Sequence, residues 1–196
     1  MSEIKDLRER LDISETKNIL NNWVAISVAI ISVFMAVSKV KDDNIVQAML
    51  QAKSDAVDTW NEYQAKKVKQ HMAELGLNQV LALQAFAPSK SVDVLVIQQK
   101  QYHDAIARYK VEEDVLMKKA KGFEKQYDDL NYRDDQFDLS DATLAVSLAM
   151  LAITALTGKR KLLILAWMLA GFGLVMGTAG LMGLPIHPSA LVKLLS

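Results

Sequence analysis

The side chains most suited to metal binding or acid–base chemistry are three histidines, His71, His103 and His187, which lie far apart in the 196-residue chain. The only carboxylates at short spacing from them are Glu74, three residues after His71, and Asp104, next to His103. Neither spacing assembles the three or so protein ligands that a zinc site requires. We therefore expect histidines that are solvated or flank the apolar seam, no metal site and no bound cofactor.

No other catalytic pattern is present in the sequence. It contains no Gly-rich phosphate loop, no G-x-S-x-G, no H-E-x-x-H and no EF-hand loop. The lack of cysteine excludes thiolate nucleophiles, disulfides and Cys-ligated metals. Carboxylates are numerous, but each has a lysine partner in the register predicted below or a solvated face. We predict no catalytic residue and no enzymatic activity, and the formal net charge of zero gives no basic footprint for nucleic acid.

Three apolar blocks interrupt the charged chain, at residues 23–40, 142–157 and 162–186. Lys39, at the edge of the first block, carries their only charge. An apolar run of about 17–25 residues is what the hydrocarbon layer of a bilayer requires of a helix. We therefore predict an all-α membrane protein with transmembrane helices at residues 23–40, 141–158 and 162–186, in contact with the lipid bilayer.

The polar side chains inside these blocks are mainly hydroxyls. Proton or ion translocation by a single copy ordinarily leaves an ionisable residue at membrane depth, and the sequence offers none there. We expect these hydroxyls to bond back to their own helices; they are Ser27, Ser32, Thr143, Ser147, Thr154 and Thr178.

Residues 41–140, between the first two predicted transmembrane helices, carry two stretches of heptad periodicity. One apolar seam recurs at spacings of three and four from Leu95 to Phe137, and a seam of smaller residues runs from Ile45 to Tyr63. Pro88 marks the turn between them, because proline disfavours the helical conformation of the preceding residue. We predict a long antiparallel coiled-coil hairpin in which paired residue numbers add up to about 180.

The predicted register also brings opposite charges together. It places Lys66 near Glu113 and Lys67 near Glu112. Exposed ion pairs are worth about 0.2–1 kcal/mol each, so they set the register more than they stabilise it. Gly76 leaves two alternatives open for the first arm, which can be kinked or ended there.

The loop end of the predicted hairpin is more apolar than two helices can bury. Burying a large side chain contributes roughly 1.5–3 kcal/mol, whereas ordering a residue costs about 1.5 kcal/mol, so two long arms alone are marginal. A second partial apolar stripe follows the first arm, along Val46, Leu50, Val57, Val68, Met72 and Leu75. We predict homo-oligomerisation, with a possible protein partner at the tip, through Leu77, Val80, Leu83, Phe86, Val94 and Ile97.

Glycines recur along the third predicted transmembrane helix. Gly173 and Gly177 have the small-xxx-small spacing that lets membrane helices approach closely. We interpret both as candidate contacts in the oligomer. The alternative is that glycine is simply frequent in membrane helices.

The flanking segments and the basic residues predict an orientation. Residues 1–22 form a short amphipathic segment, either an interfacial helix or a solvated tail, and residues 187–196 form a C-terminal tail. The basic turn at residues 159–161 lies on the same side as the basic N-terminal segment. By the positive-inside rule that side is cytoplasmic, which places the hairpin in the periplasm or outside the cell if the protein lies in a bacterial inner membrane. Three lysines on the opposite side count against this orientation: Lys39, Lys41 and Lys193.

The run DTWNEYQAKKVKQH at residues 58–71 resembles a pattern W-x-x-Y-Q-A-K-x-x-K-Q-H of a bacterial family of uncharacterised membrane proteins, domain-of-unknown-function family 4337. The resemblance extends in layout over most of the chain, as one membrane helix, a long helical insertion and two closing membrane helices. It implies no activity and transfers no functional residue. The match is carried by Trp60, Tyr63, Gln64, Ala65, Lys66, Lys69, Gln70 and His71.

Two functions from different classes fit these expectations. The first is a non-enzymatic, oligomeric membrane protein whose coiled-coil hairpin acts as a scaffold or docks a partner. The alternative is a pore-forming or transporter-accessory subunit, in which several copies enclose a pathway lined by the Gly-rich third helix.

Overall fold

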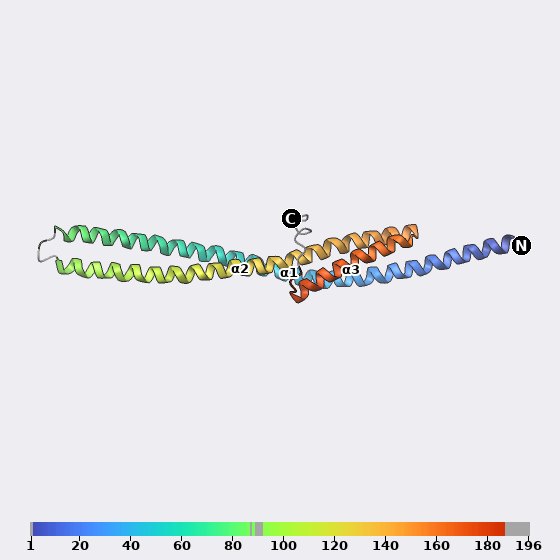
Figure 1. Ribbon diagram of the computed structural model, residues 1–196, viewed down its shortest axis with the longest axis horizontal. Coiled ribbons are helices and arrows are strands. Elements are labelled where there is room, and N and C mark those ends of the chain that lie inside the picture. The colour runs from blue at the N-terminus through green and yellow to red at the C-terminus, as the bar shows by residue number, and fades with distance from the viewer. Residues whose placement is uncertain (1, 87, 89–91, 187–196) are drawn as a thin grey trace. The chain divides into compact units, whose positions relative to one another are not determined.

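The computed structural model describes the backbone of residues 2–86, 88 and 92–186, and the side chains of these residues except 2–14 and 16. The described residues form three α-helices and no strand (Figure 1). They are α1 (Ser2–Gln84), α2 (Val92–Thr157) and α3 (Arg160–Met182). The all-α prediction is therefore confirmed. The predicted C-terminal tail and the side chains of the amphipathic N-terminal segment lie outside the described residues.

Each of the three helices is long and apolar enough to cross a membrane, by length and composition. In α1 and α2 the apolar window is only one part of a much longer helix. α3 consists almost wholly of such a window. The sequence therefore supplies three membrane-compatible segments, but two of them continue without a break into polar helix.

A glycine follows the last residue of both α2 and α3. Gly158 has φ +69° directly after α2, and its N–H donates to the Thr154 carbonyl over 2.8 Å. Gly183 has φ +65° after α3, and its N–H donates to the Ala179 carbonyl. Left-handed glycines of this kind satisfy the last carbonyls of a helix. α3 therefore stops at Met182, earlier than the predicted end at residue 186.

The chain divides into two compact units, and each is described by itself. Unit 1 comprises residues 1–47 and 130–196, and unit 2 comprises residues 48–129. Unit 1 contains the three apolar windows around a core of apolar side chains. That core is built from Leu20, Val24, Ile31, Leu144, Leu151, Leu163, Ala166 and Ala170.

Contacts between the α1 and α2 parts of unit 2 join residues with a nearly constant sum of numbers. Lys66 Nζ lies 2.6 Å from Glu112 Oε2, and the two numbers add up to 178. Gln84 Nε2 donates to Gln99 Oε1 over 3.1 Å, and those numbers add up to 183. Small side chains are buried along these contacts, among them Ala52, Ala56, Ala73 and Ala120. Such a sum is what antiparallel segments require, although the pairing of Lys66 with Glu113 was wrong by one residue.

Lys67 does not lie at Glu112 as expected. Lys66 occupies that position, and the Lys67 ammonium lies 5.8 Å from the centre of the Tyr63 ring on its own helix. A cation over an aromatic face is attracted by the ring quadrupole. The one-residue difference follows because consecutive residues lie about 100° apart around a helix, so only one of the two lysines can face α2.

α1 continues through Gly76 to Gln84, so the helix does not end at Gly76. A Cβ at Gly76 would lie 2.5 Å from Cζ of Tyr102, so the aromatic ring occupies the space that a side chain would need. The missing side chain at Gly76 therefore leaves room for the Tyr102 ring of α2. It costs helix propensity and allows close packing in return.

We expect Gly122→Ala to raise the stability of unit 2 by about 0.5–1 kcal/mol, because Gly122 lies inside α2 with nothing within 4 Å of a Cβ. Gly76→Ala should instead lower it by about 1 kcal/mol, because the Tyr102 ring must move. In a Tyr102→Ala background, Gly76→Ala should instead raise the stability of unit 2. Thermal unfolding followed by circular dichroism measures all four variants, and a gain from Gly76→Ala in the natural background would contradict the packing described.

Candidate functional site

Gly173 and Gly177 are both buried inside unit 1, where they contact other helices of their own chain. A Cβ at Gly173 would lie 2.7 Å from Leu144, and a Cβ at Gly177 would lie 2.6 Å from Ser140 Oγ and 2.7 Å from the Phe34 ring. The close approach that this spacing permits is therefore used within one chain.

Buried hydroxyls join α2 to α3 beside these glycines. Ser140 Oγ donates to the Gly173 carbonyl over 2.8 Å, and Ser147 Oγ donates to the Ala166 carbonyl over 2.8 Å. The expectation that Ser147 bonds to its own helix is therefore wrong. It is right for Thr143, Thr154 and Thr178, whose hydroxyls donate to carbonyls three or four residues earlier. Hydrogen bonds between apolar helices fix their rotation, since the alternative is an unsatisfied polar group.

A cluster of carboxylates lies at the polar end of unit 1, and we call it the acidic cluster: Asp42 on α1 with Asp134 and Asp138 on α2. Asp42 is only 3% exposed, and its Oδ2 accepts a hydrogen bond from Lys39 Nζ over 2.8 Å. Its Oδ1 is buried without a donor among the described residues. Asp134 lies within hydrogen-bonding reach of Asp42. A single lysine therefore faces several carboxylates.

The two carboxyls on α2 hold their protons more tightly than ordinary aspartates. Burial raises the pKa of Asp134 to about 6, and the negative charges of Asp138 and Asp42 add to the effect. Burial also raises the pKa of Asp138, again helped by Asp42. Like charges in a partly desolvated site cannot all ionise at neutral pH without cost. Protonation of Asp134 in the acidic cluster therefore changes near pH 6.

Two polar side chains next to the acidic cluster anchor α2 to the end of α3. Arg133 donates from Nε and Nη2 to the Gly180 carbonyl over 3.2 and 2.9 Å. Gln136 Nε2 donates to the carbonyls of Leu184 and Ile186 over 2.8 and 2.6 Å. The Gly180 carbonyl is one of the last carbonyls of α3, which lack a partner within the helix, and the carbonyls of Leu184 and Ile186 follow the helix end. A shift of α2 at this level would therefore also disturb α3.

The acidic cluster was missed in the sequence, where each carboxylate was expected to have a lysine partner or a solvated face. The signal that could have revealed it is the interval of four between Asp134 and Asp138, which puts both on one helix face. Asp134 also replaces an apolar residue in the heptad seam. A charge at a seam position faces the partner helix, and Asp42 is the residue that it meets there.

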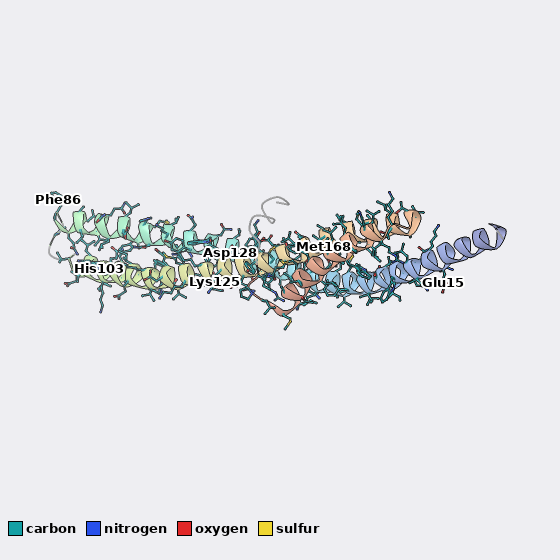
Figure 2. All side chains as sticks on the ribbon, turned by 45° about the vertical axis from the view of Figure 1, so that its right-hand side comes forward. Glu15, Phe86, His103, Lys125, Asp128 and Met168 are labelled. Carbon is teal, nitrogen blue, oxygen red and sulfur yellow. The ribbon has the colours of Figure 1, made fainter. Side chains whose placement is uncertain are left out.

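The predicted contact residues at the loop end of unit 2 differ in exposure. Phe86 is 91% exposed and lies next to the loop in Figure 2, and Leu83, Val94 and Ile97 are also exposed. Val80 is only 5% exposed and Leu77 is half-buried, so both are turned largely into unit 2. Four of the six predicted residues are therefore available to a partner.

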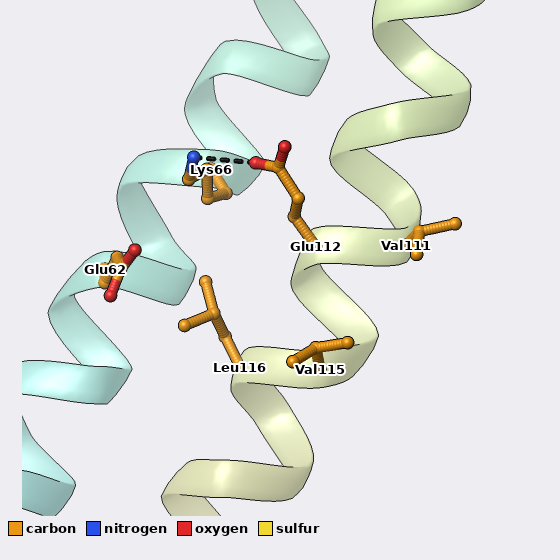
Figure 3. A pocket seen from close by; sticks show the side chains of 6 residues that line it. All are labelled: Glu62, Lys66, Val111, Glu112, Val115 and Leu116. Carbon is orange, nitrogen blue, oxygen red and sulfur yellow. Dashed lines mark ion pairs between the residues drawn. The ribbon is translucent and has the colours of Figure 1, made fainter.

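Large apolar side chains also remain exposed along both arms of unit 2. On α1 they are 52–65% exposed and comprise Leu50, Val57, Val68, Met72 and Leu75, which we call the apolar stripe. On α2, Val111 and Val115 are exposed to a similar degree. They line a shallow depression of about 270 Å³ beside Leu116, bordered by the Lys66–Glu112 ion pair (Figure 3). Soluble monomers rarely leave apolar surface of this extent uncovered.

No group of three or more His, Asp or Glu side chains suited to a metal ion occurs among the described residues. His71 Nδ1 lies 3.0 Å from Glu74 Oε2 on the surface of unit 2, and His103 is exposed. His187 lies outside the described residues. The described geometry therefore gives the two histidines a surface position and no shared ligand.

The run that carries the family resemblance contacts the α2 part of unit 2. Trp60 Nε1 donates to Glu124 Oε1 over 2.8 Å, and Lys66 pairs with Glu112. Trp60 and Tyr63 pack edge to face with ring centres 5.3 Å apart. In a comparison with protein families, residues 20–183 match the model of a family described as a domain of unknown function, DUF4337. No curated protein and no solved structure matches the chain.

Proposed function

The chain belongs to the DUF4337 family, and from this premise we propose that it is a non-enzymatic, oligomeric integral membrane protein. In this proposal unit 1 spans the bilayer as three helices, and unit 2 is an extramembrane antiparallel coiled-coil hairpin. Copies associate through the hairpin, which serves as a scaffold or docks a partner. The family description assigns no activity, so the proposal depends on the physical properties of the surfaces alone.

The membrane part is supported by the distribution of apolar residues in unit 1. Ile26, Ile30 and Val33 are more than half exposed although they belong to the first apolar window. The same holds for Ile164, Met168 and Val175 on α3. An apolar side chain in contact with lipid needs no burial inside the protein, whereas in water this surface would be costly. Membrane insertion therefore accounts for an exterior that an aqueous protein could not maintain.

The observation that carries the proposed oligomer is the apolar stripe of unit 2. Its members recur over about seven turns of α1 and lie on the opposite side from buried residues such as Ala52 and Ala56. Unit 2 lies outside the apolar windows, so lipid does not account for this stripe. Association of hairpins covers it, and burying each large side chain contributes roughly 1.5–3 kcal/mol.

We expect Val57→Cys to form a disulfide between copies when membranes are oxidised, because Val57 belongs to the apolar stripe. The chain contains no other cysteine, so any crosslinked product reports this position alone. Asp58→Cys is the matched control, because Asp58 is exposed but lies about 100° further around α1. Gel electrophoresis without reductant should show covalent dimers for Val57→Cys and far fewer for Asp58→Cys. Monomers for both variants, together with a monomeric mass in detergent, would overturn the oligomer.

The pore hypothesis has no comparable support. Its pathway needs the glycine face of α3, but Gly173, Gly177 and Gly180 contact α1 or α2 of the same chain. Gly171 and Thr178 of α3 are exposed and could line a pathway, but the Thr178 hydroxyl already donates to the Leu174 carbonyl. We therefore retain the scaffold proposal.

The proposed orientation places the N-terminus in the cytoplasm of a bacterium and unit 2 on the outer side of the inner membrane. It depends on the positive-inside rule, applied to the basic turn Lys159–Lys161. We expect Ser89→Cys in intact spheroplasts to react with an impermeant maleimide, and Lys159→Cys to react only after the cells are lysed. The reverse labelling pattern would invert the orientation and leave the three-helix membrane unit intact.

A further inference from the structure

A second depression, in unit 1, lies between α1 and the start of α3 and differs in character from the one in unit 2. Its volume is about 290 Å³, and it is lined by Ile19, Leu20, Trp23, Arg160, Leu163 and Ile164. Leu20 and Leu163 are buried and belong to the core of unit 1, so they form the floor. Ile19, Trp23 and Ile164 are half exposed and form the rim. We call this depression the α1–α3 groove; all of its lining is apolar except Arg160.

One wall of the groove is held in place by hydrogen bonding and ring packing. The rings of Trp23 and Trp167 meet edge to face with centres 5.9 Å apart. Trp167 Nε1 donates to Ser27 Oγ over 2.9 Å, and Ser27 Oγ donates to the Trp23 carbonyl over 2.8 Å. Tryptophan prefers the interface between hydrocarbon and head groups. The groove therefore lies at the depth where a lipid changes from acyl chain to head group, if unit 1 spans the bilayer as proposed.

Positive charge gathers at one end of the groove. Arg160 lines it and is the first residue of α3, flanked by Lys159 and Lys161. All three side chains are exposed, and within the described part of the chain none of them has an ion-pair partner. No side chain caps the N-terminus of α3, so its first amide groups also point toward this end. A phosphate is attracted by both the basic side chains and the helix dipole.

We propose that the α1–α3 groove binds one anionic phospholipid, with an acyl chain along Leu20 and Leu163 and its phosphate at Arg160. A free phosphate would leave the apolar floor uncovered, and an uncharged hydrocarbon would leave three cations without a counter-ion. Basic pockets between transmembrane helices on the cytoplasmic side are suited to anionic head groups. This inference rests on the proposed membrane placement of unit 1, but not on the oligomer or on the role of unit 2.

The test uses quenching of tryptophan fluorescence in vesicles that contain the full chain. Trp60→Phe removes the one tryptophan of unit 2 and leaves Trp23, which lines the groove, and Trp167, which packs against Trp23. Brominated phosphatidylglycerol and brominated phosphatidylcholine are compared at the same mole fraction in phosphatidylcholine vesicles. We expect phosphatidylglycerol to quench more strongly, with a relative association constant that falls about fivefold in Arg160→Gln, the factor that one basic side chain near the surface supplies.

Matched variants separate a site from general attraction. Lys17→Gln removes an exposed cation of α1 that does not line the groove, and it should keep the preference for phosphatidylglycerol. Ile164→Phe fills the rim of the groove and should weaken the preference for phosphatidylglycerol. Ile30→Phe changes an exposed isoleucine elsewhere on α1 and should leave that preference unchanged. Inorganic phosphate should not compete. Circular dichroism checks that each variant keeps its helix content.

Four other results would contradict the lipid site. An equal loss of the preference for phosphatidylglycerol in Arg160→Gln and Lys17→Gln would indicate unspecific attraction of the lipid to positive charge. Competition by inorganic phosphate would indicate a phosphate site. Either result would overturn the inference. Equal quenching by the two lipids would also overturn it while leaving the membrane proposal standing. Failure of the protein to float with vesicles would overturn the membrane proposal itself, and the lipid site with it.

Discussion

Gly177→Leu is expected to unfold the packing of unit 1 rather than to alter a surface. A Cβ at this position would already lie 2.6 Å from Ser140 Oγ and 2.7 Å from the Phe34 ring, and leucine adds three more carbons. Overpacking of a dense interior typically costs about 1–3 kcal/mol and occasionally more. Ser140 would also lose its place beside the Gly173 carbonyl, to which it donates over 2.8 Å. For a chain of this size about 3 kcal/mol lowers Tm by about 6–12 °C.

Gly171→Leu is the matched control for that variant. Gly171 lies in the same helix and is exposed, with nothing within 4 Å of a Cβ. The substitution should change stability by at most about 0.5 kcal/mol. Thermal unfolding in detergent, followed by circular dichroism, measures both variants. If Gly177→Leu matched Gly171→Leu in Tm and instead altered only the oligomeric state, the glycines would belong to a contact between copies, as the sequence alone suggested.

The parts of the fold that sequence predicted are those set by composition along the chain. Apolar windows locate the three membrane-compatible segments, because a run of about 17 or more apolar residues has few other uses. The offset between the contacting residues of unit 2 was also predicted approximately, since Gln84 with Gln99 gives a sum of 183 and Trp60 with Glu124 gives 184. Two segments joined by a short turn have one free parameter, the sum of paired numbers, and Lys66 with Glu112 gives 178 where about 180 was expected.

The packing inside unit 1 was not accessible in the same way. An apolar helix presents similar residues on all of its faces, so the contacts change little in composition when the helix rotates about its axis. The spacing of residues in the sequence therefore does not identify the contact partner of a glycine or a hydroxyl. Ser147 illustrates this, because nothing in the sequence distinguishes a bond to the Ala166 carbonyl from one to its own helix. The acidic cluster was missed for a related reason, since opposite charges were paired by register and the burial of Asp42 was not considered.

Unit 1 is expected to be more stable at about pH 5 than at about pH 8, because of the acidic cluster. The pKa of Asp134 is raised from 3.8 to about 6, so between these values the folded state binds a proton that the unfolded chain has lost. Stability then falls as pH rises through about 6, and the contribution is fully lost above that value. Asp138 shifts in the same direction and adds to the fall. After allowance for solvent screening the change is about 1 kcal/mol, or about 2–4 °C in Tm.

Asp134→Asn should raise Tm at about pH 8 and remove most of the difference between the two pH values. The amide carries no charge to repel Asp42 or Asp138, and its NH₂ group can supply the donor that the buried Asp42 Oδ1 lacks. Asp128→Asn is the control, because Asp128 is exposed in unit 2 and lies outside the acidic cluster. The same detergent unfolding experiment at both pH values measures the effect. An Asp134→Asn variant that kept the natural pH dependence would show that the proton is held elsewhere, whereas a loss of stability at both pH values would show that the Asp134 carboxylate is needed in its ionised form.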